Sequence, residues 1–430
     1  MLSAMIEYIY EKFLECGKVS TDTRKIEPGS LFVALKGERF NANEFAITAL
    51  ENGARYVLVD EDPKHKDERF ILVQDCLKTL QELARHHRRQ MEIPVVGING
   101  TNGKTTTKEL LVLVLSQKFN VLATQGNLNN HIGVPLTLLR LQPDHELAII
   151  ELGANAIGEI RALCDIAEPT HGLTTNIGKA HMEGFGGLEG AIRGESEQYQ
   201  YLIETNGTVF INSQDKILKN MAKRFQAPFF FPEQGDYFHA RLISADPFIC
   251  YRHENGREVQ TKLIGTYNFP NIAAALCIGK YFEVDPALAN EAVSGYQPAN
   301  QRSQLIEQGS NTIIMDAYNA NPDSMQAAIH SLSAIKNTSK VAILGDMFEL
   351  GKDSAYEHQE IGRTLSEVKL DQVLLCGKLM KDAYQAYPDA IYFENKDKLT
   401  QYLKKKKFDH SYILLKASRG VAFETIIELL

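Results

Sequence analysis

The stretch that decides the fold is GINGTNGKTT, at residues 97–106. An apolar run at residues 93–96 precedes it and predicts a buried strand, and residues 108–115 predict a helix after it. In such a strand–turn–helix unit, backbone N–H groups and the positive helix end attract phosphate oxygens. Lys104 can then reach the terminal phosphates, and the Thr105 hydroxyl can bind Mg²⁺. The stretch therefore predicts a site for a nucleoside triphosphate.

One position departs from the common spacing of this motif. The glycine that normally stands six residues before the lysine is replaced by Ile98, with Gly97 and Gly100 on either side. The alternative is a glycine-rich turn that contains Gly-Lys-Thr by chance. Because strand, lysine, hydroxyl and helix follow in the right order, we favour the phosphate cradle.

Composition limits the class of protein. The net charge of −8 argues against a general nucleic-acid binder, and the six cysteines form no CxxC pair, which is typical of reduced thiols. No apolar run approaches the roughly 20 residues that span a bilayer. Residues 1–15 have a helical pattern rather than the layout of a signal peptide. We expect a cytoplasmic monomer that neither binds nucleic acid nor inserts into a membrane.

Alternating apolar runs predict an α/β fold with more than one domain, since 430 residues exceed a single ordinary core. The expected units are residues 1–92, a central nucleotide-binding unit with a parallel sheet at 93–298, and a small doubly wound unit at 299–430. In the last unit, the run at residues 404–407 is expected to be the solvated final turn of a helix.

Polar residues end the expected strands of the central unit, at the sheet edge where parallel α/β proteins bind ligands. Glu151 follows the run at residues 147–150 and could hold Mg²⁺; the alternative is a helix-capping or ion-paired glutamate. His181 lies in a glycine-rich loop and is either a loop histidine or a ligand. Glu195 and Glu197 lie on a helical stretch, where such charges usually form a solvated face.

Two further segments carry polar groups near the expected unit boundaries. Asn268 and Asn271, in GTYNFPN at residues 265–271, suit either helix capping or an adenine contact. Asp316 follows a strand, as a ribose or metal partner would, and Asp323 or Ser324 would cap the next helix.

These motifs together resemble the Mur ligase family, and within it the MurF branch. The resemblance rests on GTNGKT at 100–105 and on segments in all three units, in family order: NLNNHIGVP at 127–135, ELGA at 151–154, AHMEGF at 180–185, YNANP at 318–322 and LGDMFELG at 344–351. It implies three domains: an N-terminal α/β domain for the UDP end of the substrate, a central P-loop ATPase domain and a C-terminal Rossmann-like domain.

The resemblance also implies the reaction. ATP and Mg²⁺ would drive addition of D-alanyl-D-alanine to UDP-N-acetylmuramoyl-tripeptide through an acyl phosphate, in peptidoglycan precursor synthesis. Two alternatives stay open. One is a related ligase with another amino acceptor, such as folylpolyglutamate synthase, against which the N-terminal unit argues. The other is a P-loop ATPase that acts as a switch or binding protein.

The resemblance assigns roles to individual residues. Nucleotide binding falls to Gly100, Thr101, Asn102, Gly103, Lys104, Thr105, Thr106, Asn268, Asn271, Arg302 and Asp316. Metal binding falls to Thr105, Glu151, His181 and Glu195, and catalysis to Lys104, His181 and Glu195. Substrate binding falls to Thr23, Arg24, Lys36, Asn129, Asn130, Asn319, Asn321 and Asp346.

Two positions depart from the family pattern. Residues 41–43 are Asn-Ala-Asn where the family has Asp-Gly-His on the uridine side. Glu195 stands where the family usually has a lysine that CO₂ converts to a carbamate. Since a glutamate and a carbamate carry the same charge and two oxygens, we expect Glu195 to supply this carboxylate directly. The alternative is that Glu197 takes the role, or that no carboxylate does.

Overall fold

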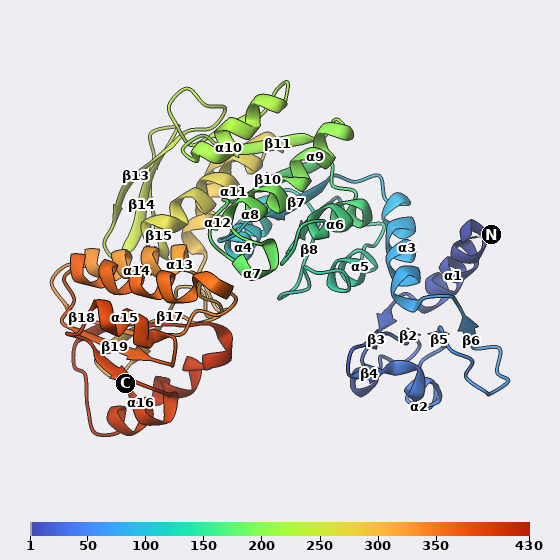
Figure 1. Cartoon of the computed structure of the whole chain (residues 1–430). Coiled ribbons are helices and arrows are strands. Elements are labelled where there is room, and N and C mark those ends of the chain that lie inside the picture. The colour runs from blue at the N-terminus through green and yellow to red at the C-terminus, as the bar shows by residue number, and fades with distance from the viewer. Residues whose placement is uncertain (1) are drawn as a thin grey trace.

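The computed structural model describes residues 2–430; Met1, the first residue of the expected helical stretch, lies outside them. The chain forms three α/β units in a row, with the N-terminal unit at one end and the C-terminal unit at the other (Figure 1). This confirms the expected fold class. We propose the boundaries expected from the sequence, residues 2–92, 93–298 and 299–430, and name the units N-terminal, central and C-terminal.

The N-terminal unit is built on a parallel sheet in the order β1-β2-β5-β6. Asp75 caps the helix α3 by accepting a hydrogen bond from the Lys78 N–H. The elements are α1 (Leu2–Cys16), β1 (Val19–Ser20), η1 (Thr23–Lys25), β2 (Leu31–Val33), β3 (Lys36–Gly37), β4 (Phe40–Asn41), η2 (Ala42–Phe45), α2 (Ala46–Glu51), β5 (Tyr56–Val59), β6 (Phe70–Leu72) and α3 (Cys76–Arg89).

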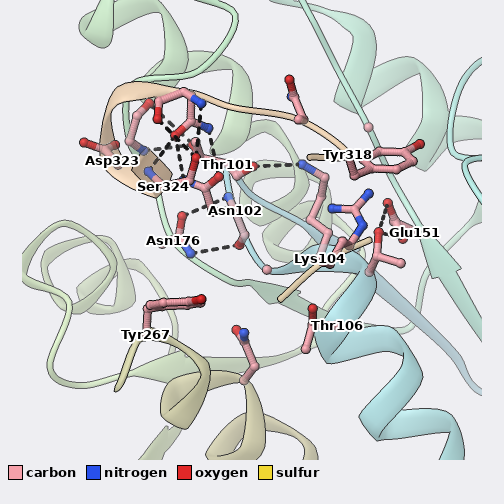
Figure 2. Close-up of a pocket in the computed structure, with 18 of the residues that line it drawn as sticks. Thr101, Asn102, Lys104, Thr106, Glu151, Asn176, Tyr267, Tyr318, Asp323 and Ser324 are labelled. Carbon is pink, nitrogen blue, oxygen red and sulfur yellow. Dashed lines mark hydrogen bonds between the residues drawn. The ribbon is translucent and has the colours of Figure 1, made fainter. Parts of the chain in front are cut away.

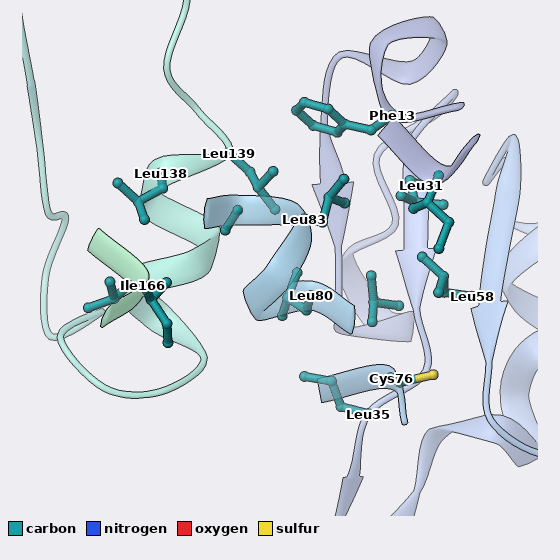
Figure 3. Close-up of a cluster of buried hydrophobic side chains, with 14 of the residues drawn as sticks. Phe13, Leu31, Leu35, Leu58, Cys76, Leu80, Leu83, Leu138, Leu139 and Ile166 are labelled. Atoms are coloured by element: carbon teal, nitrogen blue, oxygen red, sulfur yellow. The ribbon is translucent and has the colours of Figure 1, made fainter. Parts of the chain in front are cut away.

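The helix α3 joins the N-terminal unit to the central unit through one apolar core. Leu80 and Leu83 on α3 are fully buried. Figure 3 shows them between Leu31 and Leu58 of the N-terminal sheet on one side and Leu138, at the end of α5, on the other. A buried core shared in this way fixes the two units to each other.

The central sheet is parallel throughout, in the order β12-β11-β10-β7-β9-β8. Because β9 and β10 pair with opposite edges of β7, the strand order reverses at β7, where α/β sheets bind ligands. The strands are β7 (Val95–Asn99), β8 (Val121–Ala123), β9 (Leu147–Glu151), β10 (His171–Thr174), β11 (Thr208–Asn212) and β12 (Phe229–Phe231).

Both faces of this sheet are covered, as the continuous apolar runs predict. Along β9, Leu147 and Ile149 join the core under α4 and α11, and Ala148 and Ile150 join the core shared with α3. The helices are α4 (Lys104–Leu115), α5 (Gly133–Leu138), α6 (Glu159–Ala167), α7 (Met182–Phe185), α8 (Leu188–Glu195), α9 (Glu197–Glu204), α10 (Lys216–Met221), η3 (Ala222–Arg224), η4 (Thr266–Asn268), α11 (Phe269–Tyr281) and α12 (Pro286–Gly295).

A three-stranded antiparallel sheet at the C-terminal end of the central unit was not expected from the sequence. It consists of β13 (Ala240–Ala245), β14 (Phe248–His253) and β15 (Glu258–Ile264). Its alternating apolar residues, such as Ile249 and Tyr251, face the core under α11 and α12. Such alternation indicates strands with one buried face, but the pairing of the three strands depends on partners that the fold brings together.

The C-terminal unit is doubly wound, as predicted. The sheet order is β16-β17-β21-β18-β19-β20, and only β16 runs antiparallel to its neighbour. Alternate residues of β21 face opposite helix layers, Leu414 towards α13–α15 and Ile413 towards α16. The elements are β16 (Gln304–Gln308), β17 (Asn311–Asp316), α13 (Pro322–Ala334), β18 (Ser339–Gly345), η5 (Gly351–Asp353), α14 (Ser354–Glu367), β19 (Gln372–Cys376), α15 (Met380–Ala386), β20 (Ile391–Phe393), α16 (Lys396–Leu403), β21 (Ser411–Lys416), η6 (Arg419–Val421) and η7 (Phe423–Leu429).

The lysine run at residues 404–407 lies just beyond α16, whose last residue is Leu403, so the run follows the helix and does not form its final turn. Within residues 2–430, no helix combines the length and the apolar character that crossing a bilayer requires.

Candidate active site

A cavity of about 570 Å³ lies between the central and C-terminal units, at the carboxyl ends of β7 and β9. Its central wall includes residues 101–106 of the P-loop (97–106), Glu151, and Asn176, Ile177, Gly178 and His181 of the loop at residues 176–181. Its opposite wall comes from Arg302 and from the segment between β17 and α13. Figure 2 shows Lys104, Glu151 and Tyr318 facing this space from the two units.

Two glycines allow the P-loop to turn this tightly. Gly100 and Gly103 adopt φ values of +124° and +83°, which disfavour any residue with a Cβ. A Cβ on Gly100 would lie 2.3 Å from Thr175 Oγ1, and one on Gly103 would lie 2.6 Å from Asn271 Oδ1. The loop therefore packs against β10 and α11 by close backbone approach.

The two residues expected to act on phosphate and metal lie at the first turn of α4. Lys104 Nζ donates hydrogen bonds to the carbonyls of Gly100 and Thr101, so its ammonium group lies within the loop (Figure 2). Thr105 Oγ1 lies 3.1 Å and 3.2 Å from the two carboxylate oxygens of Glu151. The buried Glu151 thus faces the hydroxyl of Thr105, the residue expected to share the metal ion with it.

Two further residues complete the surroundings of Glu151, and sequence reasoning did not select one of them, Lys108. Lys108 Nζ, one helical turn after Lys104, lies 3.5 Å from Glu151 Oε2. Asn129, expected as a substrate contact, donates from Nδ2 to Glu151 Oε1 at 2.8 Å. The helical spacing of four residues from Lys104 is the signal that could have found Lys108.

Glu195 is buried beneath the P-loop and not on a solvated face, so that alternative is wrong. Its Oε2 accepts hydrogen bonds from Asn99 Nδ2 at 2.8 Å and from the Gly100 N–H at 3.0 Å. Burial raises the pKa of this carboxyl, and nearby Lys104 opposes the rise. Glu195 is not among the residues that line the cavity. Glu197 accepts hydrogen bonds from the Gly158 and Arg161 N–H groups instead.

His181 lines the cavity and contacts the C-terminal unit. Its Nδ1 lies 2.5 Å from Glu349 Oε2, which leaves Nε2 as the nitrogen free of this contact. Burial lowers the pKa of His181 below its ordinary value, against the opposing effect of Glu349. Among residues 2–430, no three His, Cys, Asp or Glu side chains gather into a metal cluster. Glu151, His181 and Glu195, the expected metal ligands of these residue types, therefore do not form one such cluster.

The C-terminal wall carries buried and stacked cations. Asp316 Oδ2 accepts a 2.6 Å ion-pair contact from Lys416 Nζ, and the two residues are paired across β17 and β21. The Arg302 and Arg419 guanidinium carbons lie 4.0 Å and 5.0 Å from the centre of the Tyr318 ring. Sequence reasoning missed Lys416 and Arg419. The signal for Lys416 was its place directly after the run at residues 412–415, just as Asp316 directly follows the run at residues 312–315.

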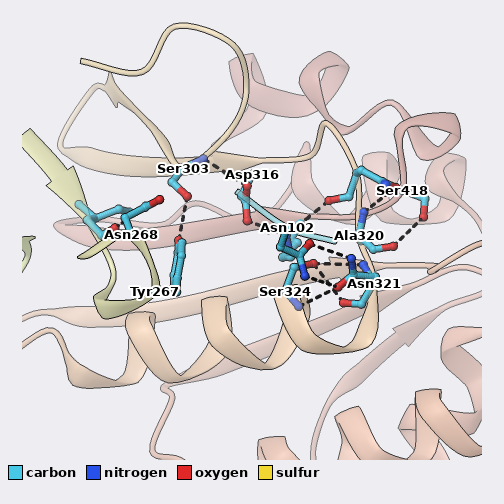
Figure 4. Close-up of polar contacts among 12 residues, drawn as sticks. Asn102, Tyr267, Asn268, Ser303, Asp316, Ala320, Asn321, Ser324 and Ser418 are labelled. Carbon is cyan, nitrogen blue, oxygen red and sulfur yellow. Dashed lines mark hydrogen bonds and ion pairs between the residues drawn. The ribbon is translucent and has the colours of Figure 1, made fainter. Parts of the chain in front are cut away.

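The two units also meet through Asn102 of the P-loop and Asn321. Asn321 Nδ2 donates to Asn102 Oδ1 at 2.8 Å (Figure 4). The same Asn321 caps α13 in a capping box with Ser324, so the expected caps, Asp323 and Ser324, are corrected to Asn321. The Asn321 side chain therefore both caps α13 and contacts the central unit, because α13 begins where the two units meet.

The adenine-side segment lines the cavity on α11. Asn268 Nδ2 donates to the Ile264 carbonyl, and Asn271 Nδ2 donates to Asn268 Oδ1, so each serves the helix start while facing the cavity. Tyr267 shares a 2.8 Å hydrogen bond with Ser303 of the C-terminal unit (Figure 4).

Several expected substrate residues lie elsewhere or act locally. Asn130 and Asn319 line the cavity, and Asn130 Oδ1 accepts from the Ile132 and Gly133 N–H groups at the start of α5. Asp346 is buried and accepts from the Met380 N–H, so it caps α15 and is not among the cavity-lining residues. The expected substrate residues of the N-terminal unit, Thr23, Arg24 and Lys36, do not line the cavity. Arg24 is ion-paired with Asp22, and Lys36 with Asp60 and Glu61.

Comparisons with known proteins agree with this architecture. The family description "Mur ligase family, catalytic domain" matches residues 16–88, "Mur ligase middle domain" matches 98–279, and "Mur ligase, glutamate ligase domain" matches 301–419.

A Bacillus subtilis relative named UDP-N-acetylmuramoyl-tripeptide–D-alanyl-D-alanine ligase is 36% identical over 95% of this chain and 92% of its own. MurF from Acinetobacter baumannii superposes with a TM-score of 0.86 at 31% identity, over 96% of this chain and 93% of its own. MurF from Thermotoga maritima, solved in complex with ADP, gives 0.86 at 27% identity over 97% of both chains. The chain therefore belongs to the Mur ligase family and, within it, to the MurF branch.

Proposed function

We propose that this protein joins D-alanyl-D-alanine to UDP-N-acetylmuramoyl-tripeptide at the cost of ATP. The observation that supports this most is the cavity between the central and C-terminal units, where the P-loop faces Arg302 and Lys416. The full-length match to relatives of that name supports the choice of substrates over those of other ligases. The same match includes the N-terminal unit, which disfavours the folylpolyglutamate-like alternative.

In this proposal the tripeptide carboxylate attacks the γ-phosphate of ATP, which gives an acyl phosphate and ADP. The dipeptide amine then attacks the activated carbonyl, and phosphate leaves. Lys104 would hold the phosphoryl oxygens, since its ammonium group belongs to the loop that cradles them. Arg302, with its guanidinium stacked on Tyr318, would place a further positive charge opposite the loop.

The donor set at α4 fits Mg²⁺, because Thr105 and Glu151 offer hydroxyl and carboxylate oxygens side by side. When bound there, Mg²⁺ would neutralise charge on the transferring phosphoryl group. Glu151 would hold the ion, with Asn129 orienting the carboxylate from its other side. His181 Nε2 would be the remaining candidate donor on this wall of the cavity.

The proposed site residues of the N-terminal unit would hold the UDP end. Lys36 keeps two carboxylate partners, Asp60 and Glu61, each at 2.9 Å, and the Asn43 amide donates to Asp60 at 2.8 Å. Asn41 and Asn43 therefore serve an acidic cluster around Lys36. Release of Lys36 from this cluster would be required before it could bind a diphosphate.

The test is ADP release by the full chain with UDP-N-acetylmuramoyl-tripeptide, ATP and Mg²⁺, with and without D-alanyl-D-alanine. We expect ADP release to depend on the dipeptide and one amide product to form per ADP. Equal ADP release without the dipeptide would instead support the ATPase-switch alternative. Activity with glutamate in place of the dipeptide would support the other ligase.

A further inference from the structure

The loop at residues 176–181 connects the P-loop to two helices of the C-terminal unit. On the central side, the Gly178 N–H donates to Thr101 Oγ1 of the P-loop at 2.8 Å. On the C-terminal side, the Lys179 N–H donates to Asp323 Oδ2 of α13 at 2.6 Å. A Cβ on Gly178 would lie 2.1 Å from this same oxygen, so a side chain here would displace the Asp323 carboxylate from the Lys179 N–H.

The Lys179 side chain adds a charge pair to this connection. Its Nζ lies 2.6 Å from Oε1 of Glu357, in the first turn of α14. The Glu357 side chain is only 4% exposed, whereas that of Lys179 is 35% exposed. The other carboxylate oxygen, Oε2, is buried without a hydrogen-bond partner. Among the residues that the structure describes, Lys179 is the only cation within ion-pair distance of Glu357.

This asymmetry makes closure of the cavity depend on Lys179. A buried carboxylate is costly unless a cation compensates it, whereas a half-exposed lysine keeps contact with water. If the C-terminal unit docks without Lys179, Glu357 is left buried and unpaired. If Glu357 is absent, Lys179 stays hydrated and little is lost.

We propose that Lys179 and Glu357 form a latch that holds the C-terminal unit against the loop at residues 176–181 and so positions the wall of the cavity. The two are positioning residues, since neither lines the cavity, while Ile177, Gly178 and His181 around them do. The latch rests on the proposed function only in the kinetic experiment, which measures ligation of D-alanyl-D-alanine.

The first experiment compares kcat/KM for D-alanyl-D-alanine among variants of the full-length protein. We expect Lys179→Met to lower kcat/KM at least about tenfold, because it leaves Glu357 unpaired on closure. Glu357→Met should cost several-fold less, and Lys179→Met/Glu357→Met should recover most of the loss. Lys179→Arg should retain near-normal kcat/KM. Lys369→Met, at an exposed lysine of the C-terminal unit, is the control and should change nothing.

A second readout follows closure itself and does not depend on the dipeptide. The radius of gyration from small-angle scattering, with ATP analogue and Mg²⁺ added, should be larger for Lys179→Met than for the wild type and should return in the double variant. Two results would overturn the latch: a Lys179→Met protein with wild-type kcat/KM and radius, or a double variant no better than Lys179→Met. A role of Glu357 confined to folding of α14 predicts that Glu357→Met is the worst variant, which would also overturn it.

The two failures are distinguishable. If the wild type releases no ADP that depends on the dipeptide, the proposed function fails, and the scattering comparison still decides the latch. If the wild type is active and the four variants equal it in both readouts, the latch fails and the proposed function stands.

Discussion

The central unit meets its two neighbours through interfaces of different character. Towards the N-terminal unit, α3 shares a continuous apolar core with α5 and α6 (Figure 3). Arg88, 7% exposed, donates to four backbone carbonyls there, at Met91, Ile93, Ala167 and Glu168. An interface built from apolar contacts and a satisfied buried arginine keeps one geometry.

Towards the C-terminal unit, the same central unit offers polar contacts around a cavity, beside an apolar contact in which Met182 and Ile264 join the core of the C-terminal unit. Asn102 meets Asn321, His181 meets Glu349, and Lys179 meets Glu357. The polar contacts exchange more readily for water than a buried apolar core does, so this interface can separate at lower cost than the core shared with α3. The comparison indicates that the first two units form one body carrying the P-loop, and under the latch proposed above the third unit acts as its lid.

The largest effect is expected at the P-loop, on the fixed side of the cavity. Lys104→Ala should lower kcat by about 10²–10³-fold, because one positive charge on the phosphoryl group is lost. The melting temperature should stay within a few degrees, since Lys104 makes hydrogen bonds only to loop carbonyls. Turnover near the wild-type rate would show that this loop is not the catalytic cradle.

The core between the N-terminal and central units gives the next effect. Leu83→Ala should lower the free energy of unfolding by about 2–4 kcal/mol, because Leu83 is fully buried in the shared core. Urea denaturation measures it, and Leu72→Ala, at a leucine that is 56% exposed, is the control with an effect within about 0.5 kcal/mol. Separate transitions for the two units in wild-type protein would contradict the single body.

Glu195→Gln tests the role of the carboxylate buried beneath the P-loop. The amide oxygen can still accept from Asn99 and the Gly100 N–H, because both bond to one oxygen, so the loop should keep its shape. The negative charge near Lys104 is lost, and we expect kcat to fall about tenfold. Added bicarbonate should stimulate neither protein, since position 195 offers no lysine to carbamylate. A fully active variant would show that the charge of Glu195 has no part in turnover.

The smallest effect concerns pH at the fixed interface. His87 Nε2 lies 3.0 Å from the Leu141 carbonyl, Tyr10 contacts Nδ1, and burial lowers the pKa of His87. The unfolded chain therefore binds a proton more readily than the folded protein, so stability should fall as pH drops below about 6.5, by at most about 1.4 kcal/mol per pH unit for this group. His87→Gln should flatten that slope in urea titrations at pH 7 and pH 5; an unchanged slope would refute the assignment.

The sequence was a good guide where one local pattern determines the structure. The P-loop, the parallel strands ending in Glu151 and Asp316, and the doubly wound last unit follow from apolar runs and glycine positions that act over a few residues. The antiparallel strands β13–β16 were missed, because their pairing depends on partners that only the folded chain supplies.

Only the tertiary structure decided which of these charged groups are buried and which are paired. Glu195 reads as one more acid on a helix, yet the fold buries it against the P-loop. Lys179 and Glu357 are 178 positions apart, and no local pattern connects them, but the docking of α14 makes them partners. Chain order and apolar period determined which units form and which loop cradles phosphate, because those signals are local. Which charges face water, and which find a partner across an interface, depends on how the units pack, because burial and pairing are properties of the assembled surfaces.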